Sequence, residues 1–221
     1  MAISERKERE KKQRRESIID AAEMLFFKKG FDNVSMNDIA EEVELNRATI
    51  YLYFDNKEAL CFAVILRGIR ILNKMIKKNV DRTNDMRKIN AIGSTYYMFF
   101  QMYPQYYQVY NFFQSGRFDL DELLNPKENY HKNFIWDVKE IIKLQKEIFD
   151  ILFDVIRNLK ENHISDDMDP KLLTIIIMSS LEGMINPSPV IKMKFDEIEL
   201  NEYQNFNVIF ISFLNRLFRL N

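Results

Sequence analysis

The sequence predicts an all-α protein of about nine helices, and three observations support this fold class. The chain of 221 residues contains only 5 Gly and 5 Pro, and no Pro precedes Pro104. Between these few helix breakers, apolar residues recur at helical spacing over long stretches. Hydrophobic residues make up 47% of the chain, as expected for a globular core. The length suits a small N-terminal domain, residues 1–60, followed by a larger helical domain, residues 61–221.

The charge of the chain is distributed unevenly. The net charge is −1, which by itself does not indicate a nucleic-acid partner. Residues 1–80, however, hold 16 Lys and Arg against 13 Asp and Glu, whereas residues 81–221 hold 16 against 20. Any electrostatic attraction of DNA would therefore come from the N-terminal part, and it would be modest.

The cysteine count and hydropathy favour a cytoplasmic protein that is not embedded in a membrane. Cys61 is the only cysteine, so no intrachain disulfide can form, and a reducing compartment is expected. The first residues are charged, and no apolar signal-peptide core follows them. The longest apolar run, from Leu172 to Met178, is far shorter than the ~20 residues of a membrane span.

Residues 4–16 form a run of mixed charge, SERKEREKKQRRE. Residues 5–15 carry seven basic and three acidic side chains. Two interpretations stay open: a solvated, partly frayed first turn of a helix, or an arm that contacts DNA phosphates. Arg14 and Arg15 lie nearest the folded domain and are the stronger candidates for phosphate contacts.

The first helix is predicted from about Glu16 to Lys29, followed by Gly30 where a C-cap glycine is expected. Lys28 and Lys29 suit the negative end of the helix dipole. The helix has one apolar stripe: Ile18, Ile19, Ala22, Leu25 and Phe26.

The segment from Ser35 to Leu60 predicts two short helices joined by a tight corner. Ser35 and Asp38 have the spacing of a capping box for a helix over 36–43. Glu44 and Leu45 form the corner, and Asn46 is a suitable N-cap for a second helix over 47–53. Two short helices across a short turn form a helix-turn-helix, whose second helix enters the major groove of DNA.

Polar side chains at the outer tips of this motif are candidate DNA contacts. Arg47 is the one with an obvious bidentate donor for guanine. Lys57 follows the N-cap candidate Asn56, at the start of a long helix whose free N–H groups favour a phosphate. That helix continues through Ile76 and is long enough to connect the two domains. The complete set of DNA-binding candidates is Arg14, Arg15, Ser35, Asn37, Asn46, Arg47, Thr49, Tyr51, Tyr53 and Lys57.

The next two predicted helices, over 88–103 and 104–115, are unusually aromatic. They follow a polar connection over 81–90, and Pro104 begins the second of them. Most of the Phe residues suit a packed core, but buried Tyr hydroxyls need partners, and rings with a few hydroxyls also suit a small-molecule cavity. Both interpretations stay open. The ligand-binding candidates are Tyr96, Phe100, Tyr103, Tyr107, Tyr110, Phe113, Phe134 and Trp136.

The remaining segments show no metal or catalytic pattern. A long helix is expected from after Pro126 to near Asn162. The acidic run over 165–169 is better explained by Asp169 capping a helix over 170–185 that begins at Pro170. His131 and His163 have no second ligand at metal spacing, so we expect no metal and no cofactor.

The C-terminal segments suggest an interface with another chain. Residues 186–200 are expected to form a loop. The last helix, over 201–220, is apolar around much of its circumference, so it should be buried on more than one side. One side would meet its own domain and the other a partner chain.

The N-terminal motif resembles the DNA-binding domain of the tetracycline-repressor (TetR) family over about residues 15–65. One departure is Glu44, where the family usually has Gly; a positive φ there would cost a Glu roughly 1 kcal/mol. The resemblance is carried by Ile19-Asp20-Ala21-Ala22, Leu25-Phe26, Gly30-Phe31, Val34-Ser35-Met36, Asp38-Ile39-Ala40, Ile50-Tyr51-x-Tyr53-Phe54 and Asn56-Lys57-Glu58-x-Leu60.

The resemblance implies a dimeric transcriptional regulator, most often a repressor, that binds a pseudo-palindromic operator. It implies that the position of Lys57 contacts the DNA backbone, and that the helices over 170–185 and 201–220 form a homodimer interface. It also implies release by a small apolar or aromatic ligand bound among the helices over 88–162.

Two other classes of function were weighed against this one. A helical ligand-binding or scaffolding protein with a degenerate DNA-binding head is favoured slightly by Glu44 and by the near-neutral charge. An enzyme is not expected, because no paired carboxylates, nucleophile–base motif, glycine-rich phosphate loop or metal spacing occurs.

Overall fold

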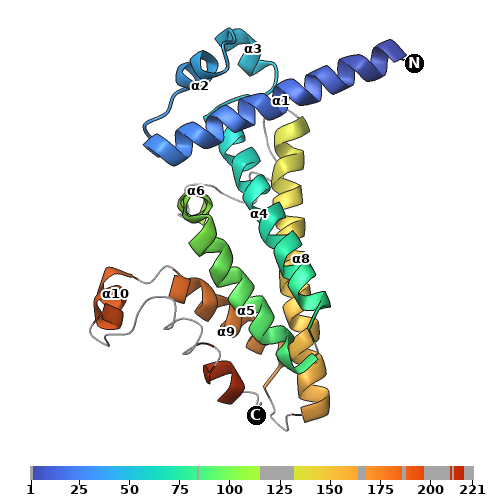
Figure 1. Cartoon of the computed structure of the whole chain (residues 1–221), viewed down its shortest axis with the longest axis vertical. Helices are drawn as coiled ribbons and strands as arrows, with labels where there is room; N and C mark the ends of the chain where they lie inside the picture. Colours follow the sequence, from blue (N-terminus) through green and yellow to red (C-terminus); the bar gives the residue numbers. More distant parts are fainter. Residues whose placement is uncertain are drawn as a thin grey trace. The chain divides into compact units, whose positions relative to one another are not determined.

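The computed structural model describes residues 2–83, 85–114, 132–163, 168–185, 188–196, 210 and 212–216 (Figure 1). These residues contain helices and no strand, which confirms the all-α class. The chain packs as two compact units. Unit 1 comprises Met1–Arg70 and Tyr103–Lys143, and unit 2 comprises Ile71–Met102 and Leu144–Asn221. The predicted functional division after residue 60 stays a prediction.

Unit 1 contains α1 (Ala2–Lys29), α2 (Met36–Glu42), α3 (Arg47–Tyr51), α6 (Pro104–Gln114), residues 57–70 of α4 (Lys57–Asp81) and residues 132–143 of α8 (Lys132–His163). α2 and α3 lie on one side of α1, and α4 descends from the other side (Figure 1). Burial of each large apolar side chain contributes about 1.5–3 kcal/mol. The most deeply buried large side chains of unit 1 are Ile18, Phe26, Ile39, Ile50, Leu60, Phe62 and Leu66.

The start of α1 differs from the sequence prediction. The helix begins at Ala2 rather than near Glu16, so residues 4–16 are regular helix and not a partly frayed turn, and their contact with DNA phosphates stays a prediction. The physical reason is local, because this stretch is rich in Glu, Lys, Arg and Gln, which favour helix. An ion pair of 2.8 Å between Arg6 and Glu10, one turn apart, adds to this preference.

Unit 2 contains residues 71–81 of α4, α5 (Asp85–Met102), residues 144–163 of α8, α9 (Pro170–Ile185) and α10 (Pro189–Asp196). Asn73 on α4 donates to the Leu144 carbonyl at 3.2 Å, and Lys77 pairs with Glu147 at 2.7 Å. These contacts fix α4 against α8 within this unit.

Several predicted boundaries are confirmed by caps. The Asp169 carboxylate accepts from the backbone of Lys171 at 2.6 Å and α9 begins at Pro170, as predicted. α6 begins at Pro104. Among the described residues, no group of acidic, Cys or His side chains could hold a metal ion. No described helix combines the length and hydropathy needed to cross a bilayer.

Other boundaries were predicted wrongly. α4 ends at Asp81 and α5 begins at Asp85, so the connection is much shorter than 81–90. The predicted loop over 186–200 contains α10, because Ser188 caps a helix that starts at Pro189: the Ser188 carbonyl accepts from Lys192 N at 2.8 Å. Two further boundaries stay predictions: in the predicted helix over 201–220 the described residues 210 and 212–216 are helical, and the start of the long helix near Pro126 lies outside the described residues.

Candidate nucleic-acid interface

The start of α2 is fixed by the predicted capping box. The Ser35 hydroxyl accepts from the backbone N of Asp38 at 3.2 Å, and Ser35 N donates to the Asp38 carboxylate at 2.7 Å. The Ser35 hydroxyl also donates to the Asp38 carboxylate at 2.5 Å, and this bond, the bond from Ser35 N and the Lys29 ammonium 3.7 Å away lower the pKa of Asp38. The box orients the exposed side chains of Ser35 and Asn37 at the first turn of α2.

The corner between α2 and α3 requires the backbone conformation for which Gly is usually chosen. Glu44 has φ 54°, a left-handed conformation that costs an L-residue with a side chain roughly 1 kcal/mol. The backbone N of Leu45 donates to the Ala40 carbonyl at 2.9 Å, and Glu44 N donates to Glu41 O at 3.1 Å. This is the hydrogen-bond pattern of a Schellman C-cap, so the Glu is accommodated in an ordinary turn.

α3 begins at the predicted N-cap, since the Asn46 side chain accepts from Ala48 N at 2.8 Å. One side of the helix is anchored by Ile50, which is fully buried, and by Phe54 just beyond the helix. The polar candidates lie around this anchor: Asn46 and Arg47 are exposed, and Thr49, Tyr51 and Tyr53 are partly exposed. The helix ends at Tyr51 rather than Tyr53.

Arg47 is held in place by its neighbour one turn along. Its guanidinium donates to the Tyr51 hydroxyl at 2.9 Å and lies 5.4 Å from the centre of the Tyr51 ring. Both interactions limit the rotamers of an otherwise exposed side chain. An arginine ordered in this way keeps further N–H donors available for a base edge or a phosphate.

The N-terminus of α4 is formed as predicted, but its lysine has an internal partner. The Asn56 side chain accepts from Ala59 N at 2.8 Å. The Lys57 ammonium donates to the Phe31 carbonyl at 2.8 Å and lies 4.2 Å from the centre of the Phe31 ring. Lys57 therefore holds the loop after α1 against α4 in this structure, and a phosphate would have to compete with that carbonyl.

The two arginines predicted at the end of the basic run have different environments. Arg14 is exposed. Arg15 is largely covered: it pairs with the buried Asp137 of α8 at 2.5 Å and lies 5.0 Å from the Phe54 ring centre. Burial raises the pKa of Asp137 to about 6, although the Arg15 and Arg70 charges oppose the shift. Arg15 is therefore committed to an internal pair, and we do not retain it as a DNA contact.

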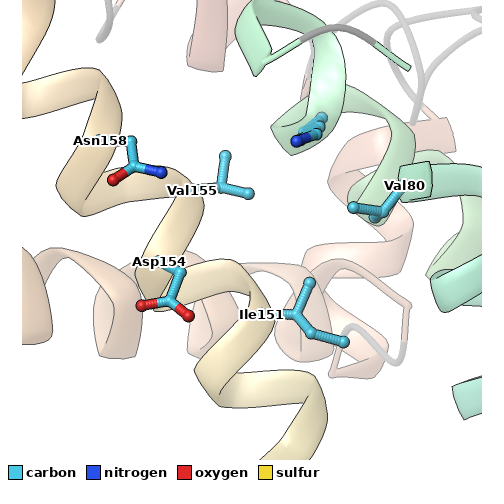
Figure 2. A pocket seen from close by; sticks show the side chains of 6 residues that line it. Val80, Ile151, Asp154, Val155 and Asn158 are labelled. Atoms are coloured by element: carbon cyan, nitrogen blue, oxygen red, sulfur yellow. The ribbon is translucent and has the colours of Figure 1, made fainter. Parts of the chain in front are cut away.

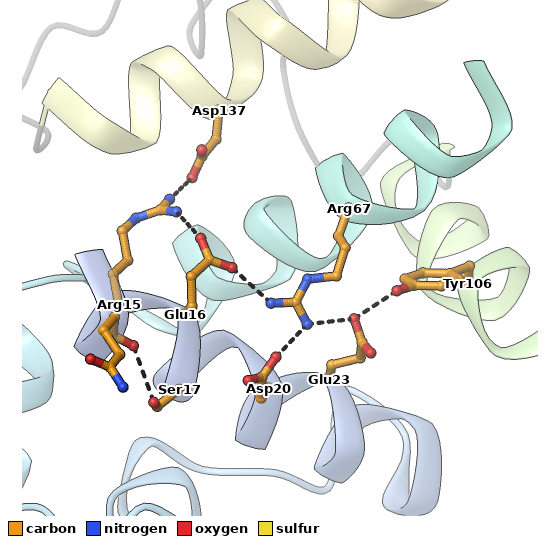
Figure 3. A network of polar contacts seen from close by, with 9 residues as sticks. Arg15, Glu16, Ser17, Asp20, Glu23, Arg67, Tyr106 and Asp137 are labelled. Atoms are coloured by element: carbon orange, nitrogen blue, oxygen red, sulfur yellow. Dashed lines mark hydrogen bonds and ion pairs between the residues drawn. The ribbon is translucent and has the colours of Figure 1, made fainter. Parts of the chain in front are cut away.

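A larger polar network joins α1 to α4 and α6 inside unit 1 (Figure 3). Arg67 on α4 contacts three carboxylates on one face of α1: Glu16 at 3.0 Å, Asp20 at 2.7 Å and Glu23 at 3.2 Å. Burial opposes ionisation of Arg67, but these carboxylates outweigh it and raise its pKa. The arginine thus clamps α4 along about two turns of α1.

Tyr106 extends this network to α6. Its hydroxyl donates to Glu23 at 2.7 Å, and burial together with that bond raises its pKa. Its ring packs edge-on against Phe27 with centroids 5.0 Å apart. A methyl group at Gly68 would lie 2.7 Å from the ring, so the absence of a side chain there permits the close approach.

Sequence reasoning missed this network. Glu16, Asp20 and Glu23 have the i, i+4, i+7 spacing of one helix face, which indicates an acidic stripe. That signal was available, but its partner Arg67 is 47 residues from Asp20 in sequence. Nothing local in the sequence identifies that pairing.

The predicted ligand-binding residues are divided between the two units. Tyr96 and Phe100 belong to unit 2, where they pack together with ring centroids 5.2 Å apart; both are buried. Tyr103, Tyr107, Tyr110, Phe134 and Trp136 belong to unit 1, and the side chain of Phe113 lies outside the described residues. Phe134 packs against Phe62 at 5.3 Å, whereas Trp136 is 51% exposed beneath Arg70. Their role in ligand binding stays a prediction.

Unit 2 contains a pocket (Figure 2). It has a volume of about 200 Å³ and is lined by Val80, Lys88, Ile151, Asp154, Val155 and Asn158. Small-molecule sites typically occupy about 300–1,000 Å³. None of the eight predicted ligand-binding residues lines this pocket, so it does not supply the predicted site.

Comparisons with known proteins agree with this geometry. Residues 18–64 match the family model for bacterial regulatory proteins of the tetR family. An HTH-type transcriptional regulator of Staphylococcus aureus strain USA300 is 23% identical over 195 residues, covering 88% of this chain and 90% of that protein.

Two solved structures share the fold. The TetR family transcriptional regulator PfmR from Thermus thermophilus has a TM-score of 0.59 at 16% identity, with 87% of this chain and 94% of that chain covered. The transcriptional regulator FadR from Bacillus subtilis, in complex with stearoyl-CoA, has a TM-score of 0.59 at 17% identity, with 88% and 94% covered. The family match spans the end of α1, all of α2 and α3, and the start of α4, and we conclude that the chain carries a TetR-family DNA-binding domain and is a DNA-binding transcriptional regulator.

Proposed function

We propose that this regulator is a homodimeric repressor that binds a pseudo-palindromic operator through α3 and is released by a small ligand. The side chains of α3 support the proposal that this helix reads DNA. Ile50 anchors the helix with no exposed surface, while Arg47 stands exposed and ordered by Tyr51. Ser35, Asn37, Asn46, Thr49, Tyr53, Lys57 and Arg14 are the proposed supporting contacts.

An apolar face of α9 supports the homodimer. Leu172, Ile175 and Ile176 have the i, i+3, i+4 spacing of one face and are 50%, 46% and 41% exposed in the single chain. A two-fold dimer would cover this face and place two copies of α3 in successive major grooves, ~34 Å apart. Leu172→Glu with Ile176→Glu should give a monomer by light scattering, and its operator affinity should fall sharply. A double variant that remains dimeric would contradict the α9 interface.

The Arg67–Glu23–Tyr106 network supports communication between α6 and the DNA-reading helices within unit 1. Any displacement of α6 must either carry Glu23 with it or break the 2.7 Å hydrogen bond. A ligand that prefers one position of α6 would therefore bias the orientation of α1 and α4, with a coupling free energy of typically ~1–3 kcal/mol.

The proposed ligand is apolar or aromatic. The residues proposed to contact it are considered within each unit: Tyr103, Tyr107, Tyr110, Phe134 and Trp136 in unit 1, and Tyr96 and Phe100 in unit 2, with Phe113 kept as a candidate from the sequence. An acyl-coenzyme A is a second candidate, because B. subtilis FadR was solved with stearoyl-CoA. Operator release should be titrated with a flat aromatic compound, a long-chain fatty acid and its coenzyme A thioester. If only the coenzyme A thioester releases the operator, the ligand is an acyl-coenzyme A and not an apolar or aromatic compound. If none of the three compounds releases the operator, both ligand proposals are wrong.

The proposal includes no catalytic activity, and it places the protein in the cytoplasm, where its operator DNA is. A scaffolding protein with a degenerate head is the second candidate, favoured by the strained Glu44 corner. Selection of bound duplexes from a random DNA pool separates the two. Enrichment of one pseudo-palindrome supports the repressor, and equal recovery of all sequences supports the scaffold.

A further inference from the structure

The N-terminal half of α1 carries a basic stripe that the helix-turn-helix motif does not explain. Lys7, Lys11 and Arg14 are exposed and follow the i, i+4, i+7 spacing of one helix face. The next position on this face, Ile18, is fully buried in the core of unit 1. Because α1 is continuous from Ala2, the stripe is in a fixed register with that core.

The stripe lies on the side of α1 opposite α4. With about 100° of rotation per residue, Lys7, Lys11 and Arg14 are about 180° around the helix from Glu16, Asp20 and Glu23. Those three carboxylates contact Arg67 of α4. α4 leaves from one side of α1, whereas α2 and α3 lie on the other (Figure 1). By this geometry, the three cations project from α1 on the side opposite α4.

The other cations of this segment are occupied or lie among acids. Arg6 pairs with Glu10 at 2.8 Å, and Arg9 donates to the Glu5 carbonyl at 3.4 Å. Within the part of the chain that the structure describes, Lys7, Lys11 and Arg14 make no hydrogen bond or ion pair.

The dimensions match a DNA backbone. Lys7 to Arg14 spans ~10 Å of helix, and a parallel stretch of duplex carries about six phosphate charges over that length. Lys7 lies ~16 Å along α1 from Ile18, so the stripe would reach phosphates beside the half-site that α3 reads. We propose that Lys7, Lys11 and Arg14 form a phosphate-binding stripe on a rigid helical extension, contacting backbone that flanks the operator half-site. This inference rests on the proposed function, because it requires operator binding.

The test compares two triple variants with the same change in charge. K7Q/K11Q/R14Q removes the stripe, and R6Q/R9Q/K12Q removes three cations from the rest of the same segment. Both are assayed on the duplex enriched by the wild-type protein, once with long flanks and once trimmed to the site. Circular dichroism checks that helix content is retained.

The stripe variant should lose operator affinity at least about tenfold near 0.1 M salt, and its log–log salt slope should become shallower by about 0.9 for each phosphate contact removed. The control variant should change less, and trimming the flanks should weaken only proteins that keep the stripe. Equal effects of the two variants, with wild-type binding intact, would overturn the stripe and leave the proposed function standing. Failure of the wild-type protein to bind any duplex, even at low salt, would overturn both.

Discussion

The two faces of unit 1 use arginine in opposite ways. On the α3 surface, Arg47 is exposed and held only by the neighbouring Tyr51. On the α1–α4 face, Arg67 is largely covered and contacts three carboxylates, with a third helix, α6, joined through Tyr106. An exposed guanidinium keeps donors for a partner, whereas a covered one fixes the angle between its helices. Burial and the number of partners, rather than residue type, distinguish a reading surface from a structural clamp.

The largest expected effect comes from removing the clamp. Arg67→Ala would leave Glu16, Asp20 and Glu23 close together without their cation and should reduce the free energy of unfolding by about 3 kcal/mol. Urea unfolding measures this value. Arg70→Ala, on the same helix but exposed, is the matched control and should cost less than about 1 kcal/mol. Similar losses for both variants would show that the network does not hold α1 to α4.

The buried Asp137 predicts a pH dependence with a definite sign. Its pKa of about 6 in the folded chain lies above the ordinary value of 3.8, so its contribution to stability is complete below pH 3.8 and is lost as the pH rises through about 6. The loss corresponds to about 3 kcal/mol. The charged groups that affect this carboxyl are Arg15, Arg70 and Glu16.

Asp137→Asn should remove that dependence. The difference in unfolding free energy between wild type and variant should shift in favour of the variant between pH 4 and pH 7. Asp150→Asn, at an exposed carboxyl of α8, controls for the removal of one negative charge. A difference for Asp137→Asn that does not change with pH would disprove the raised pKa.

A smaller effect is expected at the corner that precedes the reading helix. Glu44→Gly relieves the positive φ of 54° and should raise the free energy of unfolding by about 1 kcal/mol. Thermal denaturation detects such a gain. Glu42→Gly, at the last residue of α2, should instead be destabilising. A loss of stability in Glu44→Gly would mean that the Glu side chain makes a favourable contact of its own.

The smallest effect tests how Arg47 is ordered. Tyr51→Phe removes the 2.9 Å hydrogen bond but keeps the ring beneath the guanidinium. It should lower operator affinity about threefold and leave stability within about 0.5 kcal/mol. If Tyr51→Phe binds as tightly as wild type, the hydrogen bond does not prepare Arg47 for DNA.

Local signals in the sequence were sufficient for the motif that reads DNA. The caps at Ser35, Asn46, Asn56 and Asp169 and the helix class of the chain were all predicted, because each depends on residues within one turn. The TetR family usually has Gly at the position of Glu44, which indicated that this corner could require a positive φ. Glu44 has a positive φ in the structure.

Long-range pairing could not be predicted in the same way. Arg15 was assigned to DNA from its position in a basic run, but it pairs with Asp137, 122 residues away. The carbonyl that accepts from Lys57 belongs to a loop 26 residues earlier. The start of α1 and the helix α10 were missed for a different reason. The charged run before Glu16 and the prolines near residue 189 were interpreted as interruptions of helix, but α1 includes the charged run and α10 begins at Pro189.

The most direct test of the account is the DNA sequence that the protein selects, measured for wild type and for Arg47→Ala on the same random duplex pool. Wild type should enrich two half-sites with centres about 10 base pairs apart, each with one strongly preferred guanine. Arg47→Ala should keep the spacing and lose the preference at that guanine, a change of about 1–3 kcal/mol. Identical selected sequences for both proteins, or no enriched half-site for wild type, would contradict the assignment of α3 as the reading helix.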